Sequence, residues 1–212
     1  MKLQGVIRLG ALTIAAALAT VASASTITFN TNAAGTQFGS GGLVLNSSSG
    51  AAATLTFTPN SSATVGVPSN IDLGDFLLVC STCGPAGTGP NATFGSFTFD
   101  LVVTDTTDGA TGVFVGTSTG GTVNSNASTI SISWLPLQLG PGTSNASSGS
   151  FGPTYFTIST PTLIVAPNSG SPQGDTTVQG TVNSTTVPEP ATLAMVGGAF
   201  VALAALSRKR RK

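Results

Sequence analysis

Cys80 and Cys83 are the only cysteines of the chain, with two residues between them. Such a pair can form a disulfide, remain as two thiols or act as a thioredoxin-like redox centre, and the last of these requires a βαβ context. This pair instead follows an apolar stretch with a strand pattern and precedes Gly84-Pro85. We therefore predict a structural disulfide, formed where the surroundings are oxidising. Because its loop is short, its stabilisation should fall below the typical ~2–4 kcal/mol.

Asp105 and Asp108 form a second candidate site, in the run Asp-Thr-Thr-Asp-Gly that ends at Gly109. Their carboxylates could ligate Ca²⁺, which prefers oxygen ligands, although the spacing lacks the alternate-ligand pattern of an EF-hand loop. Aspartate also suits turns, because its side chain bonds the backbone just after it. We favour a polar turn between two strands and keep calcium as the alternative. A zinc site is not expected with two cysteines and no histidine, and no cofactor is predicted.

The residue types of common catalytic sites are missing. The chain has no histidine for a triad, and no lysine for a Schiff base lies between residues 25 and 187. No glycine-rich phosphate loop opens a helix. A glycosidase needs two carboxylates facing a cleft, and the available pairs are Asp72 with Asp75 or Asp100 with Asp105. Because nothing in the sequence marks a cleft, we predict that the protein is not an enzyme and keep glycoside hydrolysis as an alternative.

Trp134 and Tyr155 are the only tryptophan and the only tyrosine of the chain. A sugar-binding surface would use such rings as stacking platforms. Trp134, however, alternates with Ile130 and Ile132, so its ring should belong to the core.

Asn-x-Ser/Thr sequences give a further hypothesis, which is glycosylation at the surface. Many chance matches are expected, because serine and threonine are abundant. The candidate positions are Asn46, Asn60, Asn91, Asn126, Asn145 and Asn183. An intact mass equal to that of the bare polypeptide would remove this hypothesis.

The stretches that carry these residues have a period of two rather than 3.6. In Ser96–Val103, Phe97, Phe99, Leu101 and Val103 fall on one face, which is typical of a strand buried on one side. Other stretches alternate likewise or are rich in Val, Ile, Thr and Phe, as strands are. They are Thr26–Asn30, Gly42–Asn46, Thr54–Thr58, Ile71–Val79, Gly112–Thr117, Ile130–Trp134, Thr154–Val165 and Thr176–Val182.

Turn sequences separate these stretches, among them Asn60-Ser61-Ser62, Asp108-Gly109 and Gly140-Pro141-Gly142. No amphipathic helix of ten residues interrupts them. About nine or ten short strands with Gly/Pro-rich turns predict an all-β fold, namely an antiparallel β-sandwich, of which the jelly roll is one form.

Charge is distributed unevenly along the chain. All seven Lys and Arg residues lie within the first eight and the last five positions. Residues 25–187 carry six aspartates and no Glu, His, Lys or Arg, which gives a formal charge of −6. A part without cations cannot neutralise phosphates, so nucleic-acid binding is excluded.

The amino terminus has the pattern of a secretory signal peptide. Lys2 and Arg8 are followed by an apolar run to Val21, and Ala22-Ser23-Ala24 is a small-residue cleavage site. We predict cleavage by signal peptidase between Ala24 and Ser25, with an uncleaved anchor as the alternative.

The carboxyl terminus has three elements in order. They are Pro188-Glu189-Pro190, an apolar run from Leu193 to Leu206, and the basic residues Arg208, Lys209, Arg210, Arg211 and Lys212. From Ala191 to Ser207 the chain has 17 uncharged residues, the lower end of the ~17–25 that span a bilayer as a helix. Five cations resist entering hydrocarbon and should stay cytoplasmic. We predict a transmembrane helix with a basic stop-transfer end.

This tail resembles the PEP-CTERM sorting signal of exported bacterial proteins, over about the last 26 residues. The resemblance implies recognition by an exosortase, a membrane protease, with cleavage close to the Pro-Glu-Pro. The preceding part would then be released or attached at the cell surface. A tail anchor that is never cut is the alternative, and no Leu-Pro-x-Thr-Gly sortase signal is present.

These features together predict a signal peptide at 1–24, a β-sandwich domain at 25–186 and a sorting signal with a transmembrane helix at 187–212. We expect transient anchoring in the inner membrane, followed by delivery to the cell surface or extracellular matrix. The folded part would be a non-enzymatic structural or adhesive component. The alternative is a carbohydrate-binding module, calcium-assisted, with an extracellular polysaccharide as its partner.

Overall fold

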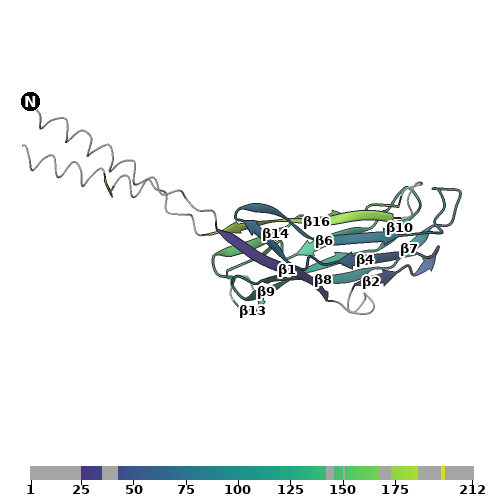
Figure 1. Ribbon diagram of the computed structural model, residues 1–212. Coiled ribbons are helices and arrows are strands. Elements are labelled where there is room, and N and C mark those ends of the chain that lie inside the picture. The colour runs from purple at the N-terminus through teal and green to yellow at the C-terminus, as the bar shows by residue number, and fades with distance from the viewer. Residues whose placement is uncertain are drawn as a thin grey trace, which may run out of the picture. The chain divides into compact units, whose positions relative to one another are not determined.

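The structure, a computed structural model, describes residues 25–34, 43–141, 146–149, 151–167, 173–185 and 197–198. Residues 25–185 form one compact unit (Figure 1). The signal peptide predicted at 1–24 lies outside the described residues. So does the sorting signal predicted at 187–212, except for Gly197 and Gly198, which are helical. Among the described residues, no helix has the length and apolar character needed to cross a membrane.

Residues 25–185 are all-β where they are described, and every strand pair is antiparallel. The seven-stranded sheet has the order β15 (Thr162–Leu163), β11 (Ser131–Leu135), β9 (Ala110–Ser118), β8 (Phe97–Asp105), β1 (Thr26–Ala34) and β5 (Ala63–Gly66), with β13 (Ala146–Ser148) beside β9. The six-stranded sheet has the order β12 (Gln138–Leu139), β14 (Thr154–Ile158), β16 (Gln173–Ser184), β6 (Ser69–Val79), β4 (Thr54–Thr58) and β2 (Val44–Asn46). A three-stranded ribbon consists of β10 (Gly121–Val123), β7 (Ala92–Phe94) and β3 (Ser49–Gly50). The all-β, antiparallel prediction is confirmed.

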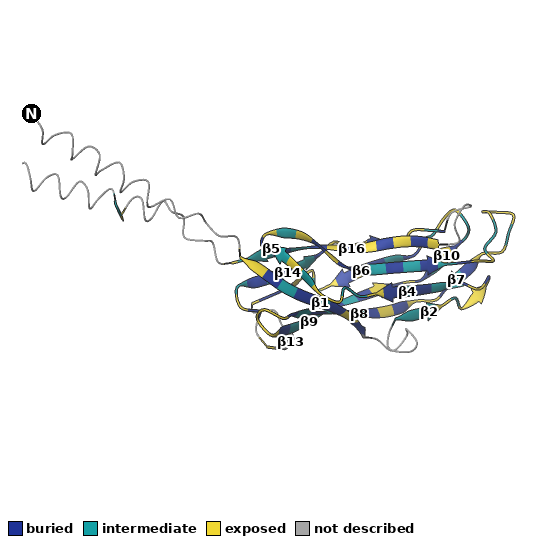
Figure 2. Ribbon diagram, in the orientation of Figure 1, coloured by how far each residue is buried: buried dark blue, intermediate teal, exposed yellow. Residues whose placement is uncertain are grey.

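Aromatic rings join the two larger sheets around one core. Phe57 on β4 and Phe76 on β6 meet Phe99 on β8, with ring centroids 4.8 and 5.0 Å apart. Phe29 on β1 meets Phe156 on β14 at 5.5 Å. Figure 2 shows buried positions alternating with exposed ones along both sheets. Such edge-on ring pairs stabilise a core beyond their buried area, and they join the inner faces of the two sheets around one core.

The predicted alternation assigns inner and outer faces correctly. Phe97, Phe99, Leu101 and Val103 on β8 are at most 2% exposed, whereas the residues between them are exposed or half-buried. The strand predicted at Thr154–Val165 is wrong as a single element. It is divided into β14, which pairs with β16, and β15, which pairs with β11 in the other sheet. Pro161 lies between them and cannot donate a ladder hydrogen bond.

Both chain ends of this unit lie at the same end of the two larger sheets (Figure 1). The Ser25 carbonyl accepts the Val67 N–H at 2.9 Å, and Ser69 pairs with Val182 close to the end of β16. From there β6 runs for eleven residues, about 35 Å at ~3.3 Å per residue. It ends beside the disulfide and the three-stranded ribbon, and we call this opposite end the tip.

Candidate functional site

The disulfide lies at the tip. The structure joins Cys80 to Cys83, with Cα atoms 5.5 Å apart, as the sequence predicts. Cys80 follows the last residue of β6 and is buried. Strands and turns surround the pair, so the described residues supply no βαβ unit of the kind that a redox centre requires.

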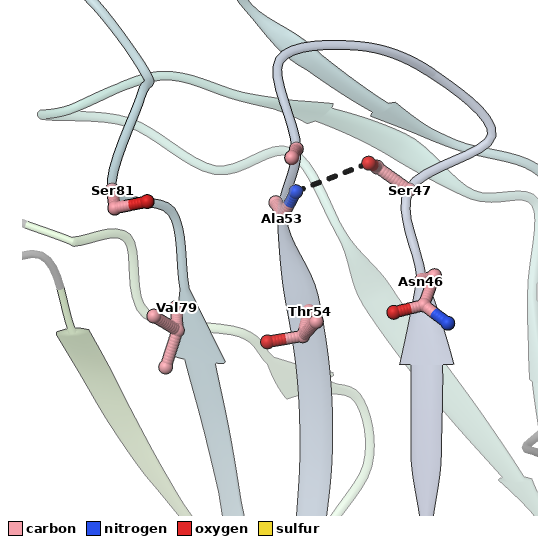
Figure 3. Close-up of a pocket in the computed structure, with 7 residues that line it drawn as sticks. Asn46, Ser47, Ala53, Thr54, Val79 and Ser81 are labelled. Atoms are coloured by element: carbon pink, nitrogen blue, oxygen red, sulfur yellow. Dashed lines mark hydrogen bonds between the residues drawn. The ribbon is translucent and has the colours of Figure 1, made fainter.

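A groove of about 440 Å³ lies next to the disulfide, and we call it the tip groove (Figure 3). Its floor is a row of Asn46, Thr54 and Val79, aligned by the register of β2, β4 and β6. The rest of its lining is Ser47, Ala52, Ala53 and Ser81. The Ser47 hydroxyl accepts the Ala53 N–H at 3.1 Å and donates to the Ala51 carbonyl at 3.0 Å, so it is already used in holding the loop. The lining of the tip groove has no charged group and offers a ligand hydroxyl, amide and apolar contacts.

Asp105 and Asp108 form a turn, as the sequence analysis favoured. Asp105 is fully buried at the end of β8, and its Oδ1 accepts the N–H groups of Thr107 at 2.9 Å and Asp108 at 3.2 Å. Burial raises the pKa of the Asp105 carboxyl, although these two N–H groups partly oppose the rise. Among the described residues, its buried Oδ2 has no hydrogen-bond partner, and no third acidic residue, Cys or His joins the pair as a metal site.

A second groove lies on the outer face of the six-stranded sheet, and we call it the polar groove. It consists of two hollows of about 370 and 300 Å³ that share Asn70 and Thr181. The register of β14, β16 and β6 arranges the outward side chains in three rows, in which Tyr155 and Thr157 are cross-strand neighbours of the lining residues Asn183 and Thr181. These rows are Tyr155–Asn183, Thr157–Thr181–Asn70 and Gln179–Asp72.

A bulge in β6 positions the carboxylate of this groove. Between the pairs Thr177–Asp75 and Gln179–Asp72 the register shifts, because Leu73 and Gly74 both face Val178. Gly74 has a φ of +121°, and the Asp72 carboxylate accepts its N–H at 2.6 Å. Bulges of this kind re-aim neighbouring side chains. Here the bulge keeps Asp72 exposed on the outer face.

The two candidate aromatics have different environments. Trp134 is 1% exposed and its Nε1–H donates to the Thr162 hydroxyl at 2.8 Å, so the prediction of a core role is confirmed. Tyr155 is half-buried on the outer face, opposite Asn183. Gly140 lies against it on the other side, where a Cβ would come within 2.5 Å of the Tyr155 Cβ. Tyr155 is therefore the aromatic ring that the sequence singled out and the fold leaves accessible.

The fold separates one of the two candidate carboxylate pairs for a glycosidase, whereas Asp72 and Asp75 both lie on the outer face of β6. Asp100 lies on the outer face of β8 and Asp105 on the inner face, so they cannot face one cleft. Asp75 accepts a hydrogen bond from the Thr177 hydroxyl at 2.7 Å, whereas Asp72 lines the polar groove.

Comparison with protein families gives one match. Residues 186–211 carry the PEP-CTERM protein-sorting motif. This confirms the resemblance inferred from Pro188-Glu189-Pro190 and the basic end, and it is consistent with an exosortase substrate. The comparison with curated proteins found no match, and neither did the comparison with solved structures.

The PEP-CTERM motif begins directly after Thr185. The Thr185 N–H donates to the Pro153 carbonyl, at the end of the unit opposite the tip. Ser25, which follows the predicted signal peptide, and Thr185, which precedes the motif, thus lie at the same end of the unit. The two grooves are distributed accordingly, with the polar groove towards the ends of the unit and the tip groove at the far end of β6.

The candidate glycosylation sites differ in exposure. Asn46, Asn91 and Asn126 are exposed, whereas Asn60 and Asn183 are half-buried and use their Nδ2 groups in hydrogen bonds to Asp72 and Thr181. Asn145 lies outside the described residues. Glycosylation stays a prediction, and exposure favours the first three positions.

Proposed function

We propose that this protein is an exported, exosortase-sorted component of the cell surface or extracellular matrix, with a structural or adhesive role for residues 25–185. The observation that carries the proposal is the PEP-CTERM motif at residues 186–211, which implies export and transient membrane anchoring. Exosortase and signal peptidase are its processing partners.

The described residues support a role without catalysis. The tip groove has no charged group in its lining, and the chain contains no histidine. Asp105, whose pKa burial raises, is buried in the core and lines neither groove. A general acid must reach its substrate, so this carboxyl is poorly placed to be one.

Mass spectrometry of the mature protein from its native cells tests the proposal. We expect an amino terminus at Ser25 and a carboxyl terminus close to Pro188-Glu189-Pro190, in protein recovered from the surface or matrix. A Glu189→Ala variant should keep residues 190–212. Cytosolic protein with both ends unprocessed would overturn the proposal.

A carbohydrate-binding module is the second candidate function, and a specific observation favours it. Tyr155 lies beside a groove lined by amides, hydroxyls and one carboxylate, which are the groups that bind sugars in proteins. A structural component that holds polysaccharide in a matrix would combine both functions.

A further inference from the structure

We propose that the polar groove binds a neutral polysaccharide, with the Tyr155 ring stacked on one sugar and Asn70, Asp72 and Gln179 bonded to hydroxyls of its neighbours. This inference rests on the proposed carbohydrate-binding function and assigns it to one face of the six-stranded sheet.

The polar side chains of this face have hydrogen-bonding capacity to spare. Among the described residues, the side-chain amides of Asn70 and Gln179 make no hydrogen bond within the protein, and each can both donate and accept. Asp72 is held by the Gly74 N–H through one oxygen, which leaves its other oxygen for a ligand. Sugar hydroxyls also donate and accept, so they can satisfy all three side chains.

The middle row of the groove is fixed by its own bonds. The hydroxyls of Thr157 and Thr181 are 2.5 Å apart, and the Asn183 amide donates to Thr181 at 3.2 Å. These contacts tie β14 to β16 beneath the groove. A ligand would therefore meet a preorganised floor, which reduces the entropy lost on binding.

Tyr155 supplies the apolar contact that sugar rings require. Its neighbours on the outer face are Asn183 on one side and Gly140 on the other, and glycine has no side chain to cover the ring. Cross-strand neighbours have Cβ atoms within about 5.5 Å, so a sugar stacked on the ring would also reach the Asn183 amide. An amphipathic ring at a wet surface suits such a contact.

The length of the groove favours a polymer over a single sugar. From Asn183 to Gln179 the rows cover five residues of β16, and the four steps between them span about 13 Å at ~3.3 Å per residue. Tyr155 and Asp72 lie at opposite ends of this span and cannot contact the same sugar ring.

Charge selects a neutral ligand. Asp72, Asp75 and Asp175 all lie on the outer face of the six-stranded sheet, and residues 25–187 contain no cation to balance them. Uronate or sulfate polymers would be repelled, because like charges brought together disfavour a complex. The tip groove, which is uncharged but has no aromatic ring in its lining, provides a matched comparison.

Affinity electrophoresis of the processed protein from its native cells tests this assignment, with hydroxyethylcellulose, mixed-linkage β-glucan, galactomannan or dextran in the gel, and alginate as the anionic control. We expect at least one neutral polymer to retard the protein and alginate to leave it unretarded. Tyr155→Ala and Gln179→Ala should each weaken the retardation at least tenfold. Tyr155→Phe, which keeps the ring, and Asn46→Ala, which alters the tip groove, should bind like the unchanged protein.

Three results would overturn the inference: no retardation by any neutral polymer, stronger retardation by alginate, or unchanged binding by both Tyr155→Ala and Gln179→Ala. Thermal unfolding shows whether the Tyr155→Ala protein is folded. Gln179→Ala changes an exposed side chain and tests polysaccharide binding independently of Tyr155. The masses of the mature ends report on sorting independently of polysaccharide binding. A protein that is processed and located as expected but binds no polysaccharide would therefore reject this inference and leave the sorting proposal standing.

Discussion

At the scale of single residues, the Asp105 carboxyl is the least typical group of the described part. It is fully buried, one oxygen accepts two backbone N–H groups, and the other has no partner among the described residues. Desolvation disfavours the charged form, so the pKa is raised above its ordinary value of 3.8. The turn thus gains two hydrogen bonds from a side chain that is costly to ionise.

Asp105 should make the free energy of unfolding depend on pH. Because its pKa is raised in the native state, its stabilising contribution is complete below about pH 3.8 and is lost as the pH rises through the raised pKa. Asp105→Asn keeps the acceptor oxygen and cannot ionise. We expect it to remove this pH dependence and to be at least as stable as the unchanged protein at pH 7. Thermal unfolding between pH 3.5 and 8 measures both effects.

Two variants serve as controls for this prediction. Asp105→Ala loses the acceptor as well as the charge, so it should cost on the order of 1–2 kcal/mol even at pH 7. Asp108→Asn changes an exposed carboxyl at the same turn and should reduce the pH dependence without removing it, because burial is the largest cause of the raised Asp105 pKa and the Asp108 charge a smaller one. An Asp105→Asn protein with the same pH slope as the unchanged protein would show that another group titrates.

At the scale of elements, β6 joins most parts of the molecule. It pairs with β4 and β16, begins next to the unit's ends, carries the bulge at Gly74 and ends at the disulfide. Gly74, at the bulge, therefore controls the outward orientation of Asp72 in the polar groove.

Gly74→Ala should be strongly destabilising. Its φ of +121° is a conformation that L-residues rarely adopt, and a Cβ there would lie 2.4 Å from the buried Phe57 ring. Backbone strain of about 1–3 kcal/mol adds to the clash, so we expect a loss of more than about 2 kcal/mol in urea unfolding. Gly66→Ala on β5 is the matched control, because nothing lies within 4 Å of its Cβ position. Equal stabilities of the two variants would contradict the role given to the bulge.

The disulfide should contribute little to the free energy of unfolding, although it is a covalent bond. Cys80 and Cys83 are only three positions apart, so the bridge removes little entropy from the unfolded chain and should be worth less than about 2 kcal/mol. Cys80→Ala with Cys83→Ala should lower the unfolding midpoint slightly and leave a two-state transition. Reduction of the unchanged protein separates the bridge from the loss of the side chains. Complete unfolding on reduction would refute this estimate.

The sequence predicts the longer strands well, because alternation over five or more residues identifies both the element and its buried face. It misses β3, β5, β7, β10, β12 and β13, which have two to four residues each. A period of two cannot be recognised over so short a length. β13, shortly after the predicted turn Gly140-Pro141-Gly142, is missed for the same reason.

The polar groove is the part of the molecule that sequence spacing could not predict. Gln179 and Asp72 are more than one hundred positions apart and meet only through the pairing of β16 with β6. Tyr155 could be singled out because it is the only tyrosine, but its place beside Asn183 depends on the pairing of β14 with β16. The sorting motif, by contrast, is a contiguous run and needs no fold to be recognised.

At the scale of the whole molecule, charge has one sign across the folded unit. Residues 25–185 contain six aspartates and no side-chain cation, so no ion pair between side chains can form there. After cleavage at Ser25, the new amino terminus would be the only positive group. Interactions between the charged side chains of this unit are therefore all repulsive, with three carboxylates on the outer face of one sheet.

Salt should therefore stabilise the mature protein. The screening length falls from about 30 Å at 0.01 M to about 8 Å at 0.15 M ionic strength, which weakens repulsion among Asp72, Asp75 and Asp175. We expect the unfolding temperature to rise by a few degrees from 0.01 to 0.5 M NaCl at pH 7. Asp75→Asn with Asp175→Asn should raise the value at low salt and reduce the slope, because less repulsion remains to be screened. A protein held by attractive ion pairs would lose stability over the same range, and that result would contradict a unit built without them.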